Sequence, residues 1–290
     1  MNTIRAVAAV AGILLAGGCA VVPPKSTGRL RVVTTIGVLA DWARQVGGNR
    51  VEVTSLLSGN ESPHTYEVKP DDVKTIADAR ILFRIGLGLE KWLDPAIHNS
   101  GNKTLAVVDA ATGLTDIVRG DEHDRSGNPH VWLDPEYARV GIGNLVTELV
   151  KLDPKGESLY RKREAAYFVR LDSLSAAISA EFAGLRDRRI ITYHDAWPYF
   201  ARRFGLDIMA AVEPIPGQEP SAKELARLVD LIRREHIKAI TTEPQLPSAL
   251  PNMLASETGV KVVVLNPLAC ENGYIAALGA SAAALVDALK

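Results

Sequence analysis

Residues 154–185 read PKGESLYRKREAAYFVRLDSLSAAISAEFAGL, and this stretch decides how the chain is organised. It contains no Gly from Glu157 to Ala183 and no Pro after Pro154. Its apolar positions recur with a period near 3.6 residues, and they are Tyr160, Tyr167, Leu171, Leu174, Ile178, Phe182 and Leu185. About thirty residues at a rise of roughly 1.5 Å make a helix of about 45 Å, which is long for a globular protein. One apolar stripe between charged flanks predicts a helix that lies across two parts of the molecule.

Strands and helices alternate on both sides of this segment. Before it, β-branched runs bounded by turn residues occur at 29–36, 50–57, 80–86 and 103–110. After it, similar runs occur at 188–193, 206–212, 237–243 and 260–265. Such alternation is typical of right-handed parallel βαβ units. The sequence therefore predicts an α/β protein of two lobes with parallel sheets, namely an N-terminal lobe (29–152), one long linking helix (153–186) and a C-terminal lobe (187–290).

The N-terminus has the pattern of an export signal. MNTIRAVAAVAGILLAGGC (1–19) has one Arg, an apolar run too short to span a bilayer, and small residues before Cys19. This pattern predicts a signal peptide over 1–18, and Cys19 after two glycines resembles a bacterial lipobox, in which the cysteine carries lipid. Residues 19–28 would then be a lipid-anchored tether, and the protein would be exported to face the periplasm or the cell exterior. Ordinary secretion, with Cys19 removed or free, is the alternative.

The composition argues against several classes of partner. The 290 residues carry a formal net charge of −1, with 47% hydrophobic and 23% charged residues. No global field favours nucleic acid, and 6% aromatic residues without a basic-aromatic stripe argue against a single-strand binder. If Cys19 carries lipid, Cys270 stands alone, so stability has to come from packed cores rather than from an internal disulfide.

Three of the six histidines stand in rigid frames near strand ends. His64 (SPHTYE) follows the second expected strand, His130 (NPHVWLDP) follows the fourth after a polar loop, and His194 (TYHDAW) directly follows the strand at 188–193. Ligands of open α/β sheets bind beyond the carboxyl ends of the strands, so these positions lie on the ligand-binding rims of both lobes. Three neutral imidazoles at one point suit zinc, and also iron, nickel or copper. The alternative is three unrelated, hydrogen-bonded histidines.

Other polar residues fall close to these positions. Asn266 directly follows the strand at 260–265. Asp195 and Glu243 are the carboxylates that could hold the tautomer of a ligating imidazole, with ordinary salt bridges as the alternative. The loop RGDEHDRSG (119–127) holds His123 among acids, and is either a weak metal-gathering loop or a solvated polar loop.

Several motifs resemble those of the zinc/manganese-type (cluster A-I) metal-binding proteins of bacterial ABC transporters, some of which have been labelled lipoprotein adhesins. The family's first, second and third ligand loops are matched by GNESPHTYEVKPDDV (59–73), GNPHVWLDP (127–135) and TYHDAWPYFARRFGL (192–206). Its other motifs are matched by GLGLEKWLD (86–94), EPSAKELARLVDLIRREHIKAITTEPQ (219–245) and VVVLNPLA (262–269). The resemblance runs in the right order from about Arg29 to the C-terminus.

The resemblance implies a zinc-uptake solute-binding lipoprotein with a metal in the cleft between the lobes. It implies His64, His130 and His194 as ligands, and a His rather than a Glu at the third position favours Zn²⁺ over Mn²⁺ or Fe²⁺. The family's fourth ligand is usually Asp, so Asn266 is a departure, and we expect a weak or water-mediated contact there because a neutral amide is a weak ligand. The implied partners are an ABC permease and its ATPase, with the membrane reached through the N-terminal lipid. No nucleic acid is expected to bind, and a monomer is expected.

Two other functions stay open from the sequence. A zinc enzyme also uses three His and a water, although no HExxH-type helix or Glu general base adjoins these histidines. A surface adhesin lacks support from repeats or from a large apolar patch. The leading prediction is an extracytoplasmic receptor, not an enzyme, that captures a divalent transition metal. The long helix predicts small lobe tilts rather than wide closure when the metal is released.

Overall fold

The computed structural model describes residues 28–59, 61–119, 126–214, 217–268 and 272–290. The predicted signal peptide and the positions Cys19, His123 and Cys270 lie outside these ranges. Among the helices of the described ranges, none is both long enough and apolar enough to cross a membrane.

Two four-stranded sheets form the frame of the molecule, and every strand pairs in parallel with its neighbours. The first sheet has the order β2-β1-β3-β4, with bounds β1 Leu30–Thr34, β2 Val51–Ser55, β3 Ile81–Arg84 and β4 Ala106–Asp109. The second has the order β6-β5-β7-β8, with bounds β5 Arg189–Thr192, β6 Asp207–Ala211, β7 Ala239–Thr242 and β8 Lys261–Val264. In each sheet the strand that comes first in the chain, β1 or β5, is an inner strand. The second strand of the chain order lies on one side of it, and the third and fourth lie on the other. The predicted α/β class with two parallel sheets is confirmed.

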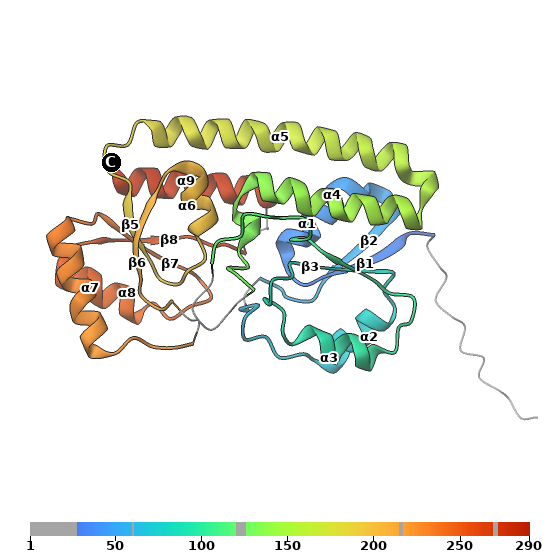
Figure 1. Ribbon diagram of the computed structural model, residues 1–290, viewed down its shortest axis with the longest axis horizontal. Helices are drawn as coiled ribbons and strands as arrows, with labels where there is room; N and C mark the ends of the chain where they lie inside the picture. The colour runs from blue at the N-terminus through green and yellow to red at the C-terminus, as the bar shows by residue number, and fades with distance from the viewer. Residues whose placement is uncertain (1–27, 60, 120–125, 215–216, 269–271) are drawn as a thin grey trace, which may run out of the picture.

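Helices connect the strands and cover the sheets (Figure 1). Those of the first half are α1 Gly37–Gly47, α2 Pro70–Ala77, α3 Leu93–Ser100 and α4 Pro135–Leu152. Those of the second half are α6 Pro198–Phe204, α7 Ala222–Glu235, α8 Ala249–Thr258 and α9 Tyr274–Leu289. The periodicity of the sequence does not predict α8, because its apolar positions do not form a clear stripe.

The long helix α5 spans Glu157–Ala183, after a short 3-10 turn at Pro154–Gly156. Its buried positions follow the predicted stripe, and they are Tyr160, Tyr167, Leu171, Ile178 and Phe182. Helix α5 packs on α1 and α4 of the first half and on α6 and α9 of the second. Figure 1 shows it running along one side of the whole molecule, over both sheets. The prediction of a long helix shared by two α/β halves is confirmed.

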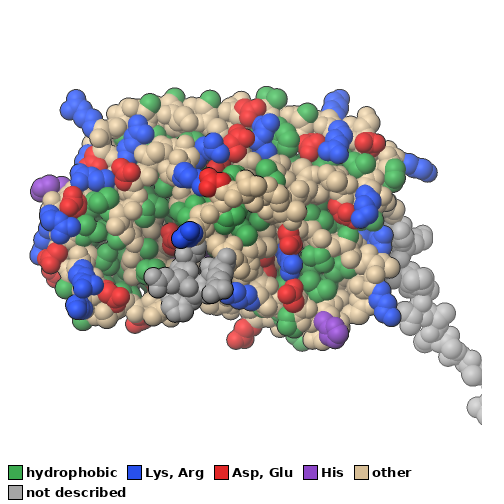
Figure 2. All heavy atoms as spheres, in the orientation of Figure 1, with side chains coloured by type: hydrophobic (Ala, Val, Ile, Leu, Met, Phe, Trp, Pro, Cys, Tyr) green, Lys and Arg blue, Asp and Glu red, His purple; other side chains and the backbone are tan. Residues whose placement is uncertain are grey.

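The largest of the apolar clusters passes from one half to the other. This cluster of buried side chains includes Trp42 and Phe83 of the first half, Phe182 of α5, and Phe200 and Leu285 of the second. On the face seen in Figure 2, Lys and Arg side chains alternate with Asp and Glu, and no large area carries one sign. The two halves are therefore joined by packing rather than by a bare tether, and their facing loops hold the histidines described next.

Candidate metal centre

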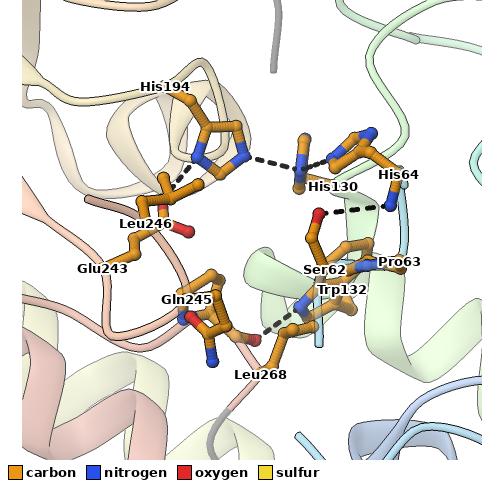
Figure 3. A pocket seen from close by; sticks show the side chains of 11 residues that line it. Ser62, Pro63, His64, His130, Trp132, His194, Glu243, Gln245, Leu246 and Leu268 are labelled. Carbon is orange, nitrogen blue, oxygen red and sulfur yellow. Dashed lines mark hydrogen bonds and ion pairs between the residues drawn. The ribbon is translucent and has the colours of Figure 1, made fainter. Parts of the chain in front are cut away.

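Three histidine rings from distant parts of the chain converge on one point (Figure 3). The Nε2 atom of His130 lies 3.1 Å from Nε2 of His64 and 3.2 Å from Nε2 of His194. One nitrogen from each ring lies within 4.8 Å of the others. A zinc ion with Zn–N bonds of about 2.0–2.1 Å in a tetrahedral shell holds its nitrogens roughly 3.3 Å apart. The two distances from His130 are thus close to those between neighbouring ligands in a tetrahedral shell.

Asn128 fixes the His130 ring from behind. The Asn128 amide donates from Nδ2 to the backbone carbonyl of Asp195 at 2.6 Å, which leaves its Oδ1 as the acceptor side. That Oδ1 accepts from the backbone N–H of His130 and lies 3.0 Å from the ring Nδ1. Because an amide oxygen can only accept, Nδ1 of His130 carries the proton and Nε2 presents a lone pair to the site.

Glu243 plays the corresponding part for His194. His194 lies in the loop after β5, and Glu243 lies in the loop after β7. Oε1 of Glu243 is 2.6 Å from Nδ1 of His194, and both side chains are almost fully buried. The contact has the length of an ion pair but not the alignment of a good hydrogen bond. A carboxylate at Nδ1 favours a proton on that nitrogen, so Nε2 of His194 also offers its lone pair to the site.

His64 lies in a loop that makes hydrogen bonds through its backbone, and among the described residues its ring lacks the kind of Nδ1 contact that His130 and His194 have. The loop follows β2, and Trp92 Nε1 donates to the carbonyl of Pro63 at 2.9 Å, which ties the backbone just before His64 to the first half. Ser62 Oγ accepts from the backbone N–H of His64 at 3.3 Å. In the described part of the chain, the His64 ring has no hydrogen-bond partner other than His130, and it is more exposed than the other two rings.

Burial and electrostatics keep the rings of His64 and His130 neutral. Burial, the neighbouring His194 and the charge of Lys91 lower the pKa of His64 to about 4. Burial, together with His194 and His64, lowers the pKa of His130 well below its ordinary value. A ring must be unprotonated to bind a metal ion, so the fold already supplies the protonation state that ligation requires.

The space beside the rings is small. The pocket has a volume of about 20 Å³, enough for little more than one water-sized sphere. Its walls are Ser62, Pro63, His64, His130, Trp132, His194, Glu243, Gln245, Leu246, Pro267 and Leu268. Pockets for organic ligands are commonly about 300–1,000 Å³. This one fits an ion with one or two small ligands.

Asp195 and Asn266 lie at the edge of the site, and side-chain oxygens of both are engaged in hydrogen bonds. The Asp195 carboxylate accepts from Asn128 Nδ2 at 3.1 Å, and burial raises the pKa of Asp195. Its hydrogen bond to Asn128 therefore connects it to His130. Asn266 Oδ1 accepts from Gln245 Nε2 at 3.0 Å and from the backbone N–H of Leu268 at 3.0 Å. Both bonds use the oxygen that metal ligation would need.

Two residues of the site were not predicted, Asn128 and Gln245. Asn128 lies two positions before His130, the spacing at which an Asx side chain can fold back on its own backbone. That spacing could have indicated it. Gln245 carries no local signal, because its partners are Gly59 and Asn266, far away in the sequence.

Comparison with known proteins agrees with this geometry. The family model described as zinc-uptake complex component A, periplasmic (ZnuA), matches residues 32–288. The high-affinity zinc uptake system protein ZnuA of Bacillus subtilis is 29% identical over 252 residues, covering 83% of this chain and 79% of that protein. The manganese-binding lipoprotein MntA of Halalkalibacterium halodurans is 26% identical over 257 residues, covering 86% and 83%. A crystal structure of ZnuA superposes with a TM-score of 0.84 at 29% identity, covering 90% of this chain and all of that one.

Proposed function

This chain belongs to the family of periplasmic zinc-uptake components, and we propose on that premise that it captures a divalent transition metal ion between its two halves for an uptake system. The observation that carries the proposal is the convergence of His64, His130 and His194, with Nε2 atoms 3.1 and 3.2 Å apart. The metal is the cargo of the protein rather than a resident cofactor. His64, His130 and His194 are the proposed ligands.

Zinc is the metal that the donor set favours. Three neutral imidazole nitrogens suit zinc, whereas manganese prefers carboxylate and carbonyl oxygens. The pocket walls supply one acidic side chain among the described residues, Glu243, and its near oxygen faces His194. Asn266 keeps its oxygen on Gln245 and Leu268, so we propose that it contributes to the shell through water rather than by a direct bond. Manganese or iron is the alternative, favoured by the likeness to MntA.

Capture rather than catalysis is supported by the size of the pocket. With about 20 Å³ beside the rings, an organic substrate has no room next to the ion. Glu243, the nearest carboxylate, is directed at Nδ1 of His194 and serves that ring rather than a water. The family itself is one of solute-binding components of metal uptake, not of enzymes.

The finer points of assembly rest on the sequence. We propose that lipid on Cys19 holds the protein at the outer side of a membrane, that it acts as a monomer, and that it delivers the ion to an ABC permease coupled to an ATPase. The tether over 19–28 would leave the folded part free to meet that permease. Detergent partitioning of wild-type protein and of Cys19→Ala tests the anchor, which the variant should lose.

Metal content and competitive titration test the binding function. Protein isolated without added metal is expected to contain zinc, and the apo form is expected to bind one Zn²⁺ more tightly than Mn²⁺ or Fe²⁺. His130→Ala removes the central ligand, and we expect at least a tenfold loss of zinc affinity, while His98→Ala, exposed on α3, leaves it unchanged. Equal zinc binding by wild-type protein and His130→Ala would refute the site.

A further inference from the structure

The two halves are fastened together strongly on one side of the metal centre. The Asp134 carboxylate accepts two hydrogen bonds from Arg203, at 2.8 and 2.9 Å. Trp132 Nε1 donates to the carbonyl of Pro267 at 2.8 Å, and Tyr274 OH donates to the carbonyl of Trp132 at 2.6 Å. His130 and His194 sit next to these ties, and each has its Nδ1 held. These two ligands therefore belong to a fixed part of the site.

The third ligand lies on a segment with a different attachment. We call residues 58–59 and 61–66 the His64 loop. Trp92 ties this loop to the first half through Pro63. Toward the second half, the backbone of the loop is joined by Gln245, whose Nε2 donates to the carbonyl of Gly59 at 2.7 Å. Gln245 itself follows β7 of the second sheet.

Gln245 is in turn held by Asn266. Its Nε2 also donates to Asn266 Oδ1 at 3.0 Å, and the backbone N–H of Leu268 fixes that oxygen as an acceptor. The two acceptors settle the orientation of the Gln245 amide, because neither Gly59 O nor Asn266 Oδ1 can donate. Gln245 Oε1 is left buried, with no hydrogen-bond partner in the described residues. Among these residues, the hydrogen bonds of the Gln245 amide are therefore the two that it donates, one to the His64 loop and one to Asn266.

We propose that Gln245, positioned by Asn266, is a latch that holds the His64 loop against the second half and so sets the rate at which the metal is released. The inference rests on the proposed function and adds a role for two side chains that are not ligands. Release requires a ligand to withdraw, and among the described residues His64 is the ring that has no partner behind it. Once Gln245 lets go of Gly59, the His64 loop can move relative to both halves, with Pro63 still bonded to Trp92, while His130 and His194 stay in place.

The role of Asn266 follows from the same contacts. An Asp at this position could give its oxygen to a metal, but Asn266 gives it to Gln245 and Leu268. The neutral amide therefore keeps the latch assembled. Asn266 is a positioning residue on this proposal, and zinc coordination is left to the three rings and water.

Zinc dissociation into an excess of chelator, followed by stopped flow, tests the latch. Gln245→Leu keeps the size of the side chain and removes both donated hydrogen bonds. Losing one such bond corresponds to about a three- to tenfold change in a rate, so release is expected to be three- to tenfold faster. Asn266→Ala is expected to act in the same direction, whereas Asn266→Asp keeps an acceptor for both donors and is not expected to speed release. Gln218→Leu, at an exposed glutamine, is the matched control and should leave the rate unchanged.

Two further measurements separate a latch from a ligand. The absorption spectrum of the Co²⁺-loaded protein should be the same in Gln245→Leu as in wild type, because the coordinating atoms are unchanged. Hydrogen exchange of the apo protein should be faster over residues 56–66 in Gln245→Leu. Wild-type release and exchange in this variant, or an altered Co²⁺ spectrum, would overturn the latch. Failure of the proposed function is recognised separately, because His130→Ala would then bind zinc as tightly as wild type.

Discussion

The carboxylate of Glu243 lies 2.6 Å from the imidazole of His194, and the two side chains are only 5% and 6% exposed. Three neutral rings around a divalent ion leave a charge of +2 in a poorly solvated place, which is unfavourable without an opposite charge. Among the described residues that line the pocket, Glu243 is the acidic one. On the proposed function, Glu243 would compensate part of the charge of the ion through His194, in addition to orienting the ring.

Replacing Glu243 by Gln should weaken zinc binding without removing a ligand. The amide keeps the size of the side chain but loses the negative charge, and we expect about a 10- to 100-fold loss of affinity, the usual effect of removing a partner behind a metal ligand. Competition titration with a chelator of known affinity measures it. Glu219→Gln, at an exposed glutamate of the same half, should bind as wild type. Equal affinities for the two variants would mean that Glu243 has no part in binding.

The depressed pKa of His64 predicts how the apo protein responds to acid. An unfolded histidine takes up a proton near pH 6.5, whereas folded His64 does so near pH 4. Between these values the unfolded state binds more protons, so the free energy of unfolding of the apo protein should fall as the pH drops from 6.5 toward 4. Thermal unfolding from pH 7.5 to 4.5 measures this. The slope should be smaller in His64→Asn and unchanged in His98→Asn, and identical slopes in all three proteins would contradict it.

Zinc binding should resist acid for the same reason. Protons compete with the ion only where the apo rings begin to protonate. With the pKa of His64 at about 4, competition from protons at His64 should be slight at pH 5.5 and become strong only as the pH approaches 4. Titrations at half-unit steps of pH check this. A fall centred near pH 6.5 in the wild type that is absent from His64→Asn would show that His64 titrates like a free histidine.

The fold could be predicted from the sequence because its signals are local. The buried stripe of α5 and the β-branched strands are set by periodicity, and parallel pairing places strand ends on a common edge. His194 comes directly after β5, so its position on that edge needed no tertiary information. The helix α8 escaped prediction because its apolar positions do not form a clear stripe.

The contacts within the site depend on tertiary packing and were less predictable. Asp195 adjoins His194 in the chain, yet its carboxylate turns to Asn128 in the other half. Asn266 was expected near the metal, and its oxygen is bonded to Gln245 and Leu268. In both cases a side-chain partner, Asn128 or Gln245, comes from another segment of the chain, near the boundary between the two halves. The spacing of residues within one segment therefore cannot predict it.

The buried ion pair between Arg203 and Asp134 should contribute strongly to stability. Asp134 is 1% exposed and also accepts from the backbone N–H of Glu136 at the start of α4. Arg203→Met leaves this carboxylate without its partner, and we expect a loss of about 3 kcal/mol, the low end for breaking a buried pair because Arg203 is 35% exposed. Lys74→Met removes an exposed pair with Asp71 and should cost less than about 1 kcal/mol. Urea unfolding of the apo proteins compares the two, and equal losses would argue against the buried pair as a tie between the halves.

Removal of zinc should change the shape of the protein very little. Helix α5 packs on elements of both halves, and Trp132 is bonded to Pro267 and Tyr274 across the same boundary. A wide hinge motion would break these contacts together, whereas movement of the His64 loop breaks the bond between Gln245 and Gly59. Small-angle scattering of apo and zinc-bound protein should therefore give radii of gyration within about 1 Å of each other. His130→Ala with added zinc serves as the control for effects of the ion away from the site. A decrease of several ångströms on zinc binding, seen in wild type and absent from this variant, would mean that the halves close as rigid bodies and that α5 bends to allow it.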